Sequence, residues 1–116
     1  MHKKIIFDTN FLLYTAKFNI DIFSELKRIC DFPYKLYILD KTLKELKGKK
    51  GAKLALDLIK EKVKIIKTKK EQDVDSLLLE LKNFIIATQD KALKKKLKEK
   101  KIKIITIRQK KYLSLN

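Results

Sequence analysis

The run Lys3-Lys4-Ile5-Ile6-Phe7, followed at once by Asp8-Thr9-Asn10, is the segment from which the fold can be worked out. Its short β-branched core is typical of a buried strand, and it ends abruptly at a carboxylate. Much further along, Phe84-Ile85-Ile86-Ala87 runs in the same way into Thr88-Gln89-Asp90. The sequence therefore predicts two strands that each place an aspartate just beyond their carboxyl ends.

Short apolar runs alternate with longer segments of helical periodicity along the rest of the chain. Three more runs are expected to be strands, at Lys35–Leu39, Val63–Ile66 and Ile102–Ile107. Helical patterns cover Ile20–Cys30, Lys41–Lys47, Ala52–Lys62, Asp73–Lys82 and a segment after Asp90 that ends at about Lys100, and Arg108–Asn116 is expected to be a short tail. Strands separated by helices imply crossover connections. We expect an α/β fold of three layers, α/β/α, with a mostly parallel central sheet.

The length and composition fit one domain over residues 1–116. The chain is 45% hydrophobic and has only two glycines and one proline, so we find no linker and no repeat. Cys30 is the single cysteine, which excludes an internal disulfide and a cysteine zinc site, and its spacing places it on the apolar side of a helix. The apolar run before Asp8 is too short for a signal peptide, and nothing approaches a membrane-spanning length. We expect a cytoplasmic protein with no membrane partner.

Charge is the most prominent feature of the composition. Lysine and arginine number 30 against 14 aspartates and glutamates, a formal net charge of +16. Heat-adapted surfaces also enrich lysine, but their ion-pair networks balance the two signs, and this chain does not. A surplus of this size favours a polyanion, of which nucleic acid is the commonest. The residues predicted to contact phosphates are Lys91, Lys94, Lys95, Lys98 and Arg108; a solvated helix face is the alternative.

Acidic side chains occur where the strands of an open parallel sheet would present a ligand site. They are Asp8 after the first strand, Glu45 on the helix after the second, Asp73 and Asp75 at the start of a helix, and Asp90 after the fourth strand. Two carboxylates about 5 Å apart repel by roughly 3 kcal/mol at an effective dielectric near 20. A hard divalent cation such as Mg²⁺ or Mn²⁺ removes that cost, activates water and neutralises a phosphate.

Each acid also has an interpretation that involves no catalysis. Asp8 could simply cap a helix that starts at Phe11, and either Asp73 or Asp75 could cap the helix that follows. Glu45 could be a solvated ion-pair partner on a lysine-rich helix, and the helix dipole favours Asp90 where it stands. Tyr34 and Tyr112 are candidates for stacking on bases, although packing explains them equally well.

Four segments, in order, resemble the motifs of PIN-domain nucleases. They are Ile5-Ile6-Phe7-Asp8-Thr9-Asn10, Lys41-Thr42-Leu43-Lys44-Glu45-Leu46, Val74-Asp75-Ser76-Leu77-Leu78 and Ile85-Ile86-Ala87-Thr88-Gln89-Asp90. The likeness spans nearly the whole chain. It is closest to small archaeal PIN proteins related to ribosomal RNA-processing nucleases and to VapC-type toxins.

The resemblance implies a Mg²⁺- or Mn²⁺-dependent endoribonuclease that cleaves single-stranded RNA. By that likeness Asp8, Glu45, Asp75 and Asp90 would be the catalytic metal ligands, with Asn10 and Thr88 supporting them. The implied partners are RNA, a second copy in a homodimer, and an antitoxin or a ribosome-assembly partner. Relatives often carry paired aspartates at the third motif, whereas Ser76 follows Asp75 here. That departure leaves open which of Asp73 and Asp75 is the third acid. The sequence also leaves open whether one metal ion or two is bound.

Other function classes fit the sequence less well. A receiver-type phospho-switch would need an aspartate after the third strand, which ends in Ile66-Lys67-Thr68, and a phosphohydrolase would need Asp-x-Asp where Asp8-Thr9-Asn10 stands. No glycine-rich loop exists for P-loop chemistry, and no serine has a credible base partner. The remaining alternative is a non-catalytic, basic RNA-binding or scaffold module with a degraded PIN-like site.

Overall fold

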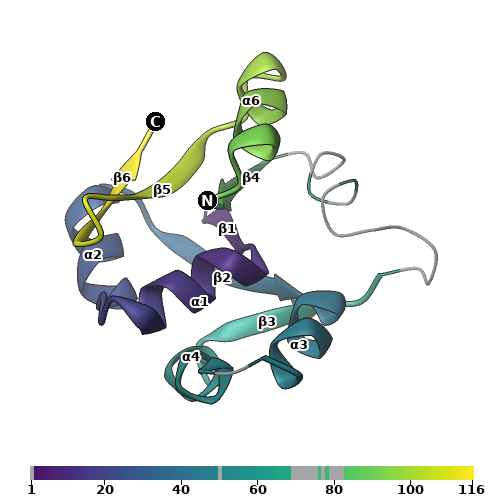
Figure 1. Cartoon of the computed structure of the whole chain (residues 1–116). Coiled ribbons are helices and arrows are strands. Elements are labelled where there is room, and N and C mark those ends of the chain that lie inside the picture. Colours follow the sequence, from purple (N-terminus) through teal and green to yellow (C-terminus); the bar gives the residue numbers. More distant parts are fainter. Residues whose placement is uncertain (1, 50, 69–75, 77, 79–82) are drawn as a thin grey trace.

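Six strands form one sheet in the order β3-β2-β1-β4-β5-β6 (Figure 1). The computed structural model describes residues 2–49, 51–68, 76, 78 and 83–116. The strands are β1 (Lys3–Phe7), β2 (Tyr34–Leu39), β3 (Val63–Ile66), β4 (Phe84–Ala87), β5 (Ile104–Arg108) and β6 (Tyr112–Leu115). The helices of this part of the chain are α1 (Thr9–Lys17), α2 (Ile22–Ile29), α3 (Asp40–Lys47), α4 (Ala52–Ile59) and α6 (Lys91–Glu99).

The five strands from β1 to β5 are parallel, as the alternation of apolar runs and helices predicted. From β1 the chain adds β2 and then β3 on one side, and it crosses back to place β4 on the other side of β1. The strand order therefore reverses between β1 and β4, whose residues pair in register from Lys4 with Phe84 to Phe7 with Ala87. Open α/β sheets bind ligands at the carboxyl ends of the strands at such a switch point.

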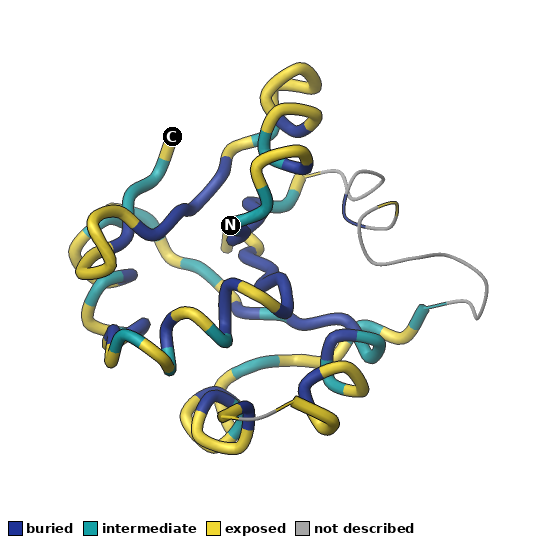
Figure 2. The backbone as a smooth tube through the Cα atoms, in the orientation of Figure 1, coloured by how far each residue is buried: buried dark blue, intermediate teal, exposed yellow. Residues whose placement is uncertain are grey.

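Helices cover both faces of the sheet, which gives the expected three layers (Figure 2). Alternate strand residues point to opposite faces, so Ile5 and Phe7 belong to one buried cluster and Ile6 to the other. The larger cluster includes buried residues of α1, α2, α3 and α4. The smaller one joins β1 and β4 to Leu93 and Leu97 of α6 and to Leu78. Cys30 packs at the margin of the larger cluster, as its helical spacing predicted, and burial raises the pKa of its thiol.

The prediction that residues 108–116 form a tail is wrong, because β6 turns back and pairs antiparallel with β5. Gln109 and Lys110 make this reversal at positive φ, and the Lys111 N–H donates to the Arg108 carbonyl across the turn. Turns of this kind normally use Asn-Gly or Asp-Gly, and neither pair is present. The sequence therefore carried no signal for the hairpin.

Element boundaries also differ from the expected ones by a few residues. The helix expected from Phe11 begins at Thr9, and the helix expected to reach Lys62 ends at Ile59. The last parallel strand begins at Ile104 rather than Ile102. The helix predicted over Asp73–Lys82 lies outside the described residues, apart from positions 76 and 78.

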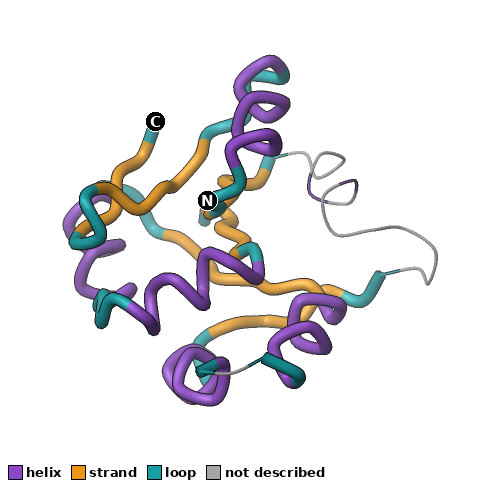
Figure 3. The backbone as a smooth tube through the Cα atoms, viewed as in Figure 1, coloured by secondary structure: helices purple, strands orange, loops and turns teal. Residues whose placement is uncertain are grey.

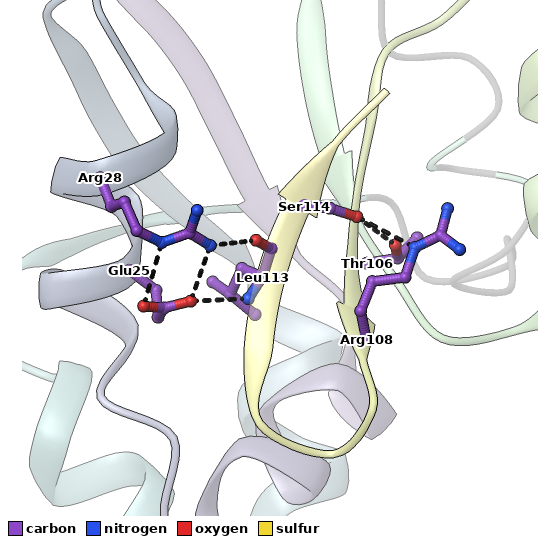
Figure 4. Close-up of polar contacts among 6 residues, drawn as sticks. All are labelled: Glu25, Arg28, Thr106, Arg108, Leu113 and Ser114. Atoms are coloured by element: carbon purple, nitrogen blue, oxygen red, sulfur yellow. Dashed lines mark hydrogen bonds and ion pairs between the residues drawn. The ribbon is translucent and has the colours of Figure 1, made fainter.

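The outer edge of β6 is bound by side chains of α2, which lies beside it (Figures 3 and 4). The Leu113 N–H donates to Glu25 Oε1 at 2.8 Å, and Arg28 Nη2 donates to the Leu113 carbonyl at 2.7 Å. Arg28 also contacts Glu25 directly, at 3.0 Å, and this hydrogen bond holds the pKa of Glu25 below its usual range. Together the two side chains replace the neighbouring strand that β6 lacks at this position.

None of the described helices is long and apolar enough to cross a membrane.

Candidate active site

The carboxyl end of β1 leads directly into α1, and Asp8 stands at the junction. It is the N-cap of α1, with its side-chain Oδ1 accepting a hydrogen bond from the Thr9 N–H at 2.8 Å. Its own N–H donates to the Ala87 carbonyl at 2.9 Å, which continues the pairing of β1 with β4. Only 6% of the residue is exposed. A carboxylate buried to this degree is costly unless its environment compensates the charge, and the N-terminus of α1 contributes to that compensation.

Thr88, the residue after β4, connects the segments that carry the two strand-end aspartates. Its hydroxyl donates to Asp8 Oδ2 at 2.9 Å and accepts from the Asp90 N–H at 3.2 Å, and the residue is fully buried. Its N–H donates to the Ile105 carbonyl of β5, which fixes the backbone on the far side. Thr88 thus fixes the position of Asp8, which follows β1, relative to the turn after β4.

Asp90 is the N-cap of α6, and its Oδ1 accepts from the Leu93 N–H at 3.0 Å. The residue is half-buried and, like Asp8, lies just beyond the carboxyl end of a central strand. The cap uses one oxygen in a described hydrogen bond, and a carboxylate has further acceptor positions. Asp8 and Asp90 are therefore both presented at the switch point of the sheet.

A cavity of about 390 Å³, which Asp90 helps to line, opens between α1 and the turn after β4. Gln89 in that turn is fixed by β5, because the Ile107 N–H donates to its Oε1 at 2.6 Å. Asn10 is exposed at the first turn of α1. The residues that line the cavity are Asn10, Leu13, Tyr14, Lys17, Gln89 and Asp90.

The other predicted acids do not join Asp8 and Asp90 in the part of the chain that the structure describes. Glu45 is exposed on α3, and the predicted ligand Asp75, like Asp73, lies outside the described residues. Among the described residues no three side chains of histidine, cysteine, aspartate or glutamate gather into a group that could hold a metal ion. What the structure brings to one edge is a pair of acids with Thr88 between them.

Comparison with known proteins identifies the family. Residues 5–110 match the sequence family described as a PIN-like domain, which is nearly the whole chain.

The chain belongs to the PIN-like domain family.

Two relatives agree with this PIN-like assignment over almost their full lengths. The chain is 35% identical to Ribonuclease VapC4 of Methanocaldococcus jannaschii over 127 aligned positions, which cover 97% of this chain and 95% of that protein. It also superposes on the structure of the PIN domain endonuclease Utp24 with a TM-score of 0.84 and 25% identity, covering 97% of this chain and 90% of that one. Both relatives are nucleases by name.

Sequence reasoning missed one acid of this PIN-like domain that also follows a strand. Asp40 comes directly after β2, so the signal that singled out Asp8 and Asp90 applied to it as well. Its carboxylate accepts from the Thr68 hydroxyl at 2.6 Å, from the Thr68 N–H at 3.1 Å and from the Lys41 N–H. These bonds, those of Thr68 first, lower the pKa of Asp40. Asp40 therefore anchors the chain where it leaves β3.

The predicted phosphate-binding residues of the PIN-like domain lie on α6 and at the end of β5. Lys91, Lys95, Lys98 and Arg108 are exposed, whereas Lys94 is half-buried. Burial lowers the pKa of Lys94, and the nearby positive charges of Arg108, Lys98 and Lys91 lower it further. Lys94 is thus close enough to Arg108, Lys98 and Lys91 to be repelled by them, which an anion bound beside Lys94 would relieve.

The tyrosines proposed for stacking lie away from the cavity, and a third tyrosine lines it. Tyr34 packs against the larger core cluster, and Tyr112 lies under the Arg28 guanidinium, 5.7 Å from its ring centroid. Tyr14 of α1 is 41% exposed and borders the cavity. Its position depends on how α1 docks on the sheet, so no local sequence signal identified it.

Proposed function

We propose that this PIN-like domain is a metal-dependent endoribonuclease that cleaves single-stranded RNA. The observation that carries the proposal is the buried Asp8 carboxylate, joined through the Thr88 hydroxyl to the segment of Asp90 at the switch point of the sheet. Relatives named as a ribonuclease and as an endonuclease support the reaction class. We also propose that residues 1–116 form a single domain, because strands from both ends of the chain share one sheet.

The donor set at this edge fits a hard divalent cation. Asp8 and Asp90 offer carboxylate oxygens, which Mg²⁺ and Mn²⁺ prefer over nitrogen or sulfur. The Thr9 hydroxyl, next to Asp8, is buried and has no hydrogen-bond partner among the described residues, so it can serve a water molecule held at the site. The bound cation would activate water and neutralise the phosphate. Glu45 and Asp75 stay proposed ligands by family likeness alone.

The chain's own residues would bind and orient the RNA. The cations of α6 and β5 would hold the phosphate backbone, and Asp90 is the N-cap of α6, so bound RNA would run toward the acids. Thr88 would keep the Asp8 carboxylate in one orientation, and Asn10 would contribute at the mouth of the cavity. Positioning of this kind is what a phosphodiester cleavage needs from protein groups.

The test compares the wild type with Asp8→Asn on labelled RNA at low salt, in Mn²⁺, Mg²⁺ or EDTA. We expect cleavage only with a metal ion and none from Asp8→Asn. Asp57→Asn is the matched control, because Asp57 is an exposed acid of α4 that pairs with Lys60. A circular single-stranded RNA, which has no ends, tests for endonuclease cleavage, and a duplex of the same sequence tests the preference for single strands.

The same experiment identifies the alternative, a basic scaffold that binds RNA without cutting it. RNA binding that is equal in wild type and Asp8→Asn, with no cleavage in either metal, would sink the catalytic proposal. Calorimetry with Mn²⁺ then provides an independent readout, since a scaffold has no reason to bind the ion through Asp8. Heat of binding that Asp8→Asn removes supports the metal site.

Two cytoplasmic roles are compatible with the proposed reaction. A toxin of the VapC type would be held by an antitoxin, and an RNA-processing enzyme would act with a ribosome-assembly partner; either could work as a homodimer. Growth arrest on expression of the wild type, absent with Asp8→Asn, would favour the toxin. Light scattering of the purified protein reports on the dimer.

A further inference from the structure

One side of α1 faces the cavity beside the acids. Asn10, Leu13, Tyr14 and Lys17 all line it, and their spacings of three and four residues put them on the same side of the helix. Tyr14 follows Asp8 by six residues, which is about 9 Å along a helix axis. A group bound against Tyr14 would therefore share the cavity with Asp90 without occupying the place of Asp8.

The ring of Tyr14 is exposed and yet held in position. It stacks on Phe18, one turn later, with ring centroids 5.9 Å apart and an angle of 12° between the planes. Phe18 is itself packed against the larger core cluster, so the pair is anchored to the body of the domain. Tyrosine has few rotatable bonds, and this neighbour limits them further. The exposed 41% of Tyr14 thus offers an aromatic surface that loses little entropy when a ligand covers it.

Two lysines from different elements lie beside this aromatic pair. The Nζ atoms of Lys17, at the end of α1, and of Lys110, in the turn between β5 and β6, are each 5.5 Å from the centroid of the Phe18 ring. Within the described part of the chain neither ammonium group forms an ion pair with a carboxylate. Two positive charges beside Phe18, on which the exposed Tyr14 ring stacks, attract a ligand that combines an anion with a flat, polarisable group.

We propose that Tyr14 is a stacking platform for an unpaired nucleobase, with the adjoining phosphate held by Lys17 and Lys110. This inference rests on the proposed function, because it names how that site would hold its RNA. Asp90 also lines the cavity, and its carboxylate can accept a hydrogen bond from a base. The cavity volume of about 390 Å³ lies within the range of small-ligand pockets.

The platform explains a preference for single-stranded RNA by a physical argument. A base in a duplex has both faces covered by its neighbours and must be unstacked before it can contact a protein ring. In a single strand the base is available, and every base has a face that can stack, so the subsite is tolerant of sequence. The exposed Asn10 amide is the described group best placed to add a preference among bases.

The experiment measures binding of a short fluorescein-labelled single-stranded RNA by anisotropy in EDTA, where cleavage cannot interfere. The comparison strand has the same length and carries abasic ribose in place of every base. Tyr14→Leu removes the ring but keeps a large side chain that suits a helix, and Tyr14→Phe keeps the ring. Tyr34→Leu is the control, because it makes the same change at the amino end of β2, away from the cavity. Thermal unfolding of each variant verifies that it is folded.

We expect Tyr14→Leu to weaken binding of the base-bearing RNA by about 5- to 100-fold, the range seen when a stacked ring is removed. Binding of the abasic strand should hardly change, and Tyr14→Phe and Tyr34→Leu should bind both strands like the wild type. An equal loss with both strands, or no loss with either, would overturn the platform, as would a wild type that binds neither.

Cleavage of the same RNA in Mn²⁺ separates this inference from the proposed function. Ring-dependent binding without cleavage would reject the nuclease and keep the platform. Normal cleavage with binding that is unchanged in Tyr14→Leu would reject the platform and keep the nuclease.

Discussion

Asp8 and Glu25 both accept a hydrogen bond from a backbone N–H, but their second donors differ in charge. For Asp8 that donor is the Thr88 hydroxyl, and for Glu25 it is the Arg28 guanidinium. A neutral donor orients a carboxylate without cancelling its charge, whereas a guanidinium neutralises it. The Thr88 contact therefore orients the Asp8 carboxylate, whereas the Arg28 contact fixes the end of the sheet. We therefore propose that the Asp8 region serves the function and that the Glu25 region serves stability.

The largest expected effect comes from replacing the neutral donor. Thr88→Val keeps the shape of the side chain but removes both hydrogen bonds of its hydroxyl, to Asp8 and from the Asp90 N–H. We expect RNA cleavage to fall about 10- to 100-fold, the usual cost of losing a group that orients a metal ligand. Initial cleavage rates in Mn²⁺ measure the effect.

Thr88→Ser is the matched control, because it retains the hydroxyl. It should cleave RNA at nearly the wild-type rate. If Val and Ser at this position behave alike, the orienting role of the hydroxyl is refuted, and with it the functional half of the comparison.

The next effect concerns stability at β6. Glu25→Ala removes the acceptor of the Leu113 N–H and the partner of Arg28, so the free energy of unfolding should fall by about 1 kcal/mol. Cleavage should be unchanged. Urea unfolding measures the first expectation, with Glu99→Ala, an exposed acid of α6, as the control. A cleavage defect in folded Glu25→Ala would break the division between the two regions.

The pH dependence of this contribution follows from the direction of the pKa shift. Arg28 lowers the pKa of Glu25 in the folded chain, so the charged form favours folding. The contribution is complete above the ordinary glutamate pKa and is lost as the pH falls through the lowered one. The stability difference between wild type and Glu25→Gln should therefore shrink on acidification, and a difference that grows would contradict the assignment.

The smallest expected effect is a gain in stability at the turn before β6. Gln109 is at φ 52° in the turn before β6, a conformation that asparagine adopts more readily than glutamine. Gln109→Asn should raise the free energy of unfolding by about 0.5 kcal/mol, because left-handed strain is reduced. Cleavage should not change. Gln109→Ala should give no gain, and an equal gain from both would show that the turn strain is not the cause.

Much of the fold could be predicted because most of the strands are recognisable in the sequence as short apolar runs. Runs such as Ile5–Phe7 and Phe84–Ala87 are apolar and β-branched, and the helices between them impose parallel pairing. β6 could not be predicted, since Gln109 and Lys110 adopt their turn without a glycine and Leu113 relies on side chains from α2. Local sequence contains no information about such distant partners.

Some features of the candidate site could likewise be predicted from the sequence, and others could not. The positions of Asp8 and Asp90 at strand ends followed from the pattern, because parallel strands present their carboxyl ends together. The engagement of Asp40 by Thr68 requires that β2 and β3 be neighbours, and the exposure of Tyr14 depends on the docking of α1. Both features depend on the tertiary structure and not on the local sequence. The roles of Asp8, Glu45, Asp75 and Asp90 as metal ligands stay predictions.

The occupied edge at Leu113 has a consequence for how this protein behaves when it is concentrated. An edge strand with unpaired backbone groups can pair with a strand of another polypeptide, and repeated pairing of this kind leads to aggregation. Here a newcomer would first have to displace Glu25 and Arg28 from the Leu113 N–H and carbonyl. Glu25 and Arg28 therefore protect the edge of β6 from pairing with a strand of another molecule.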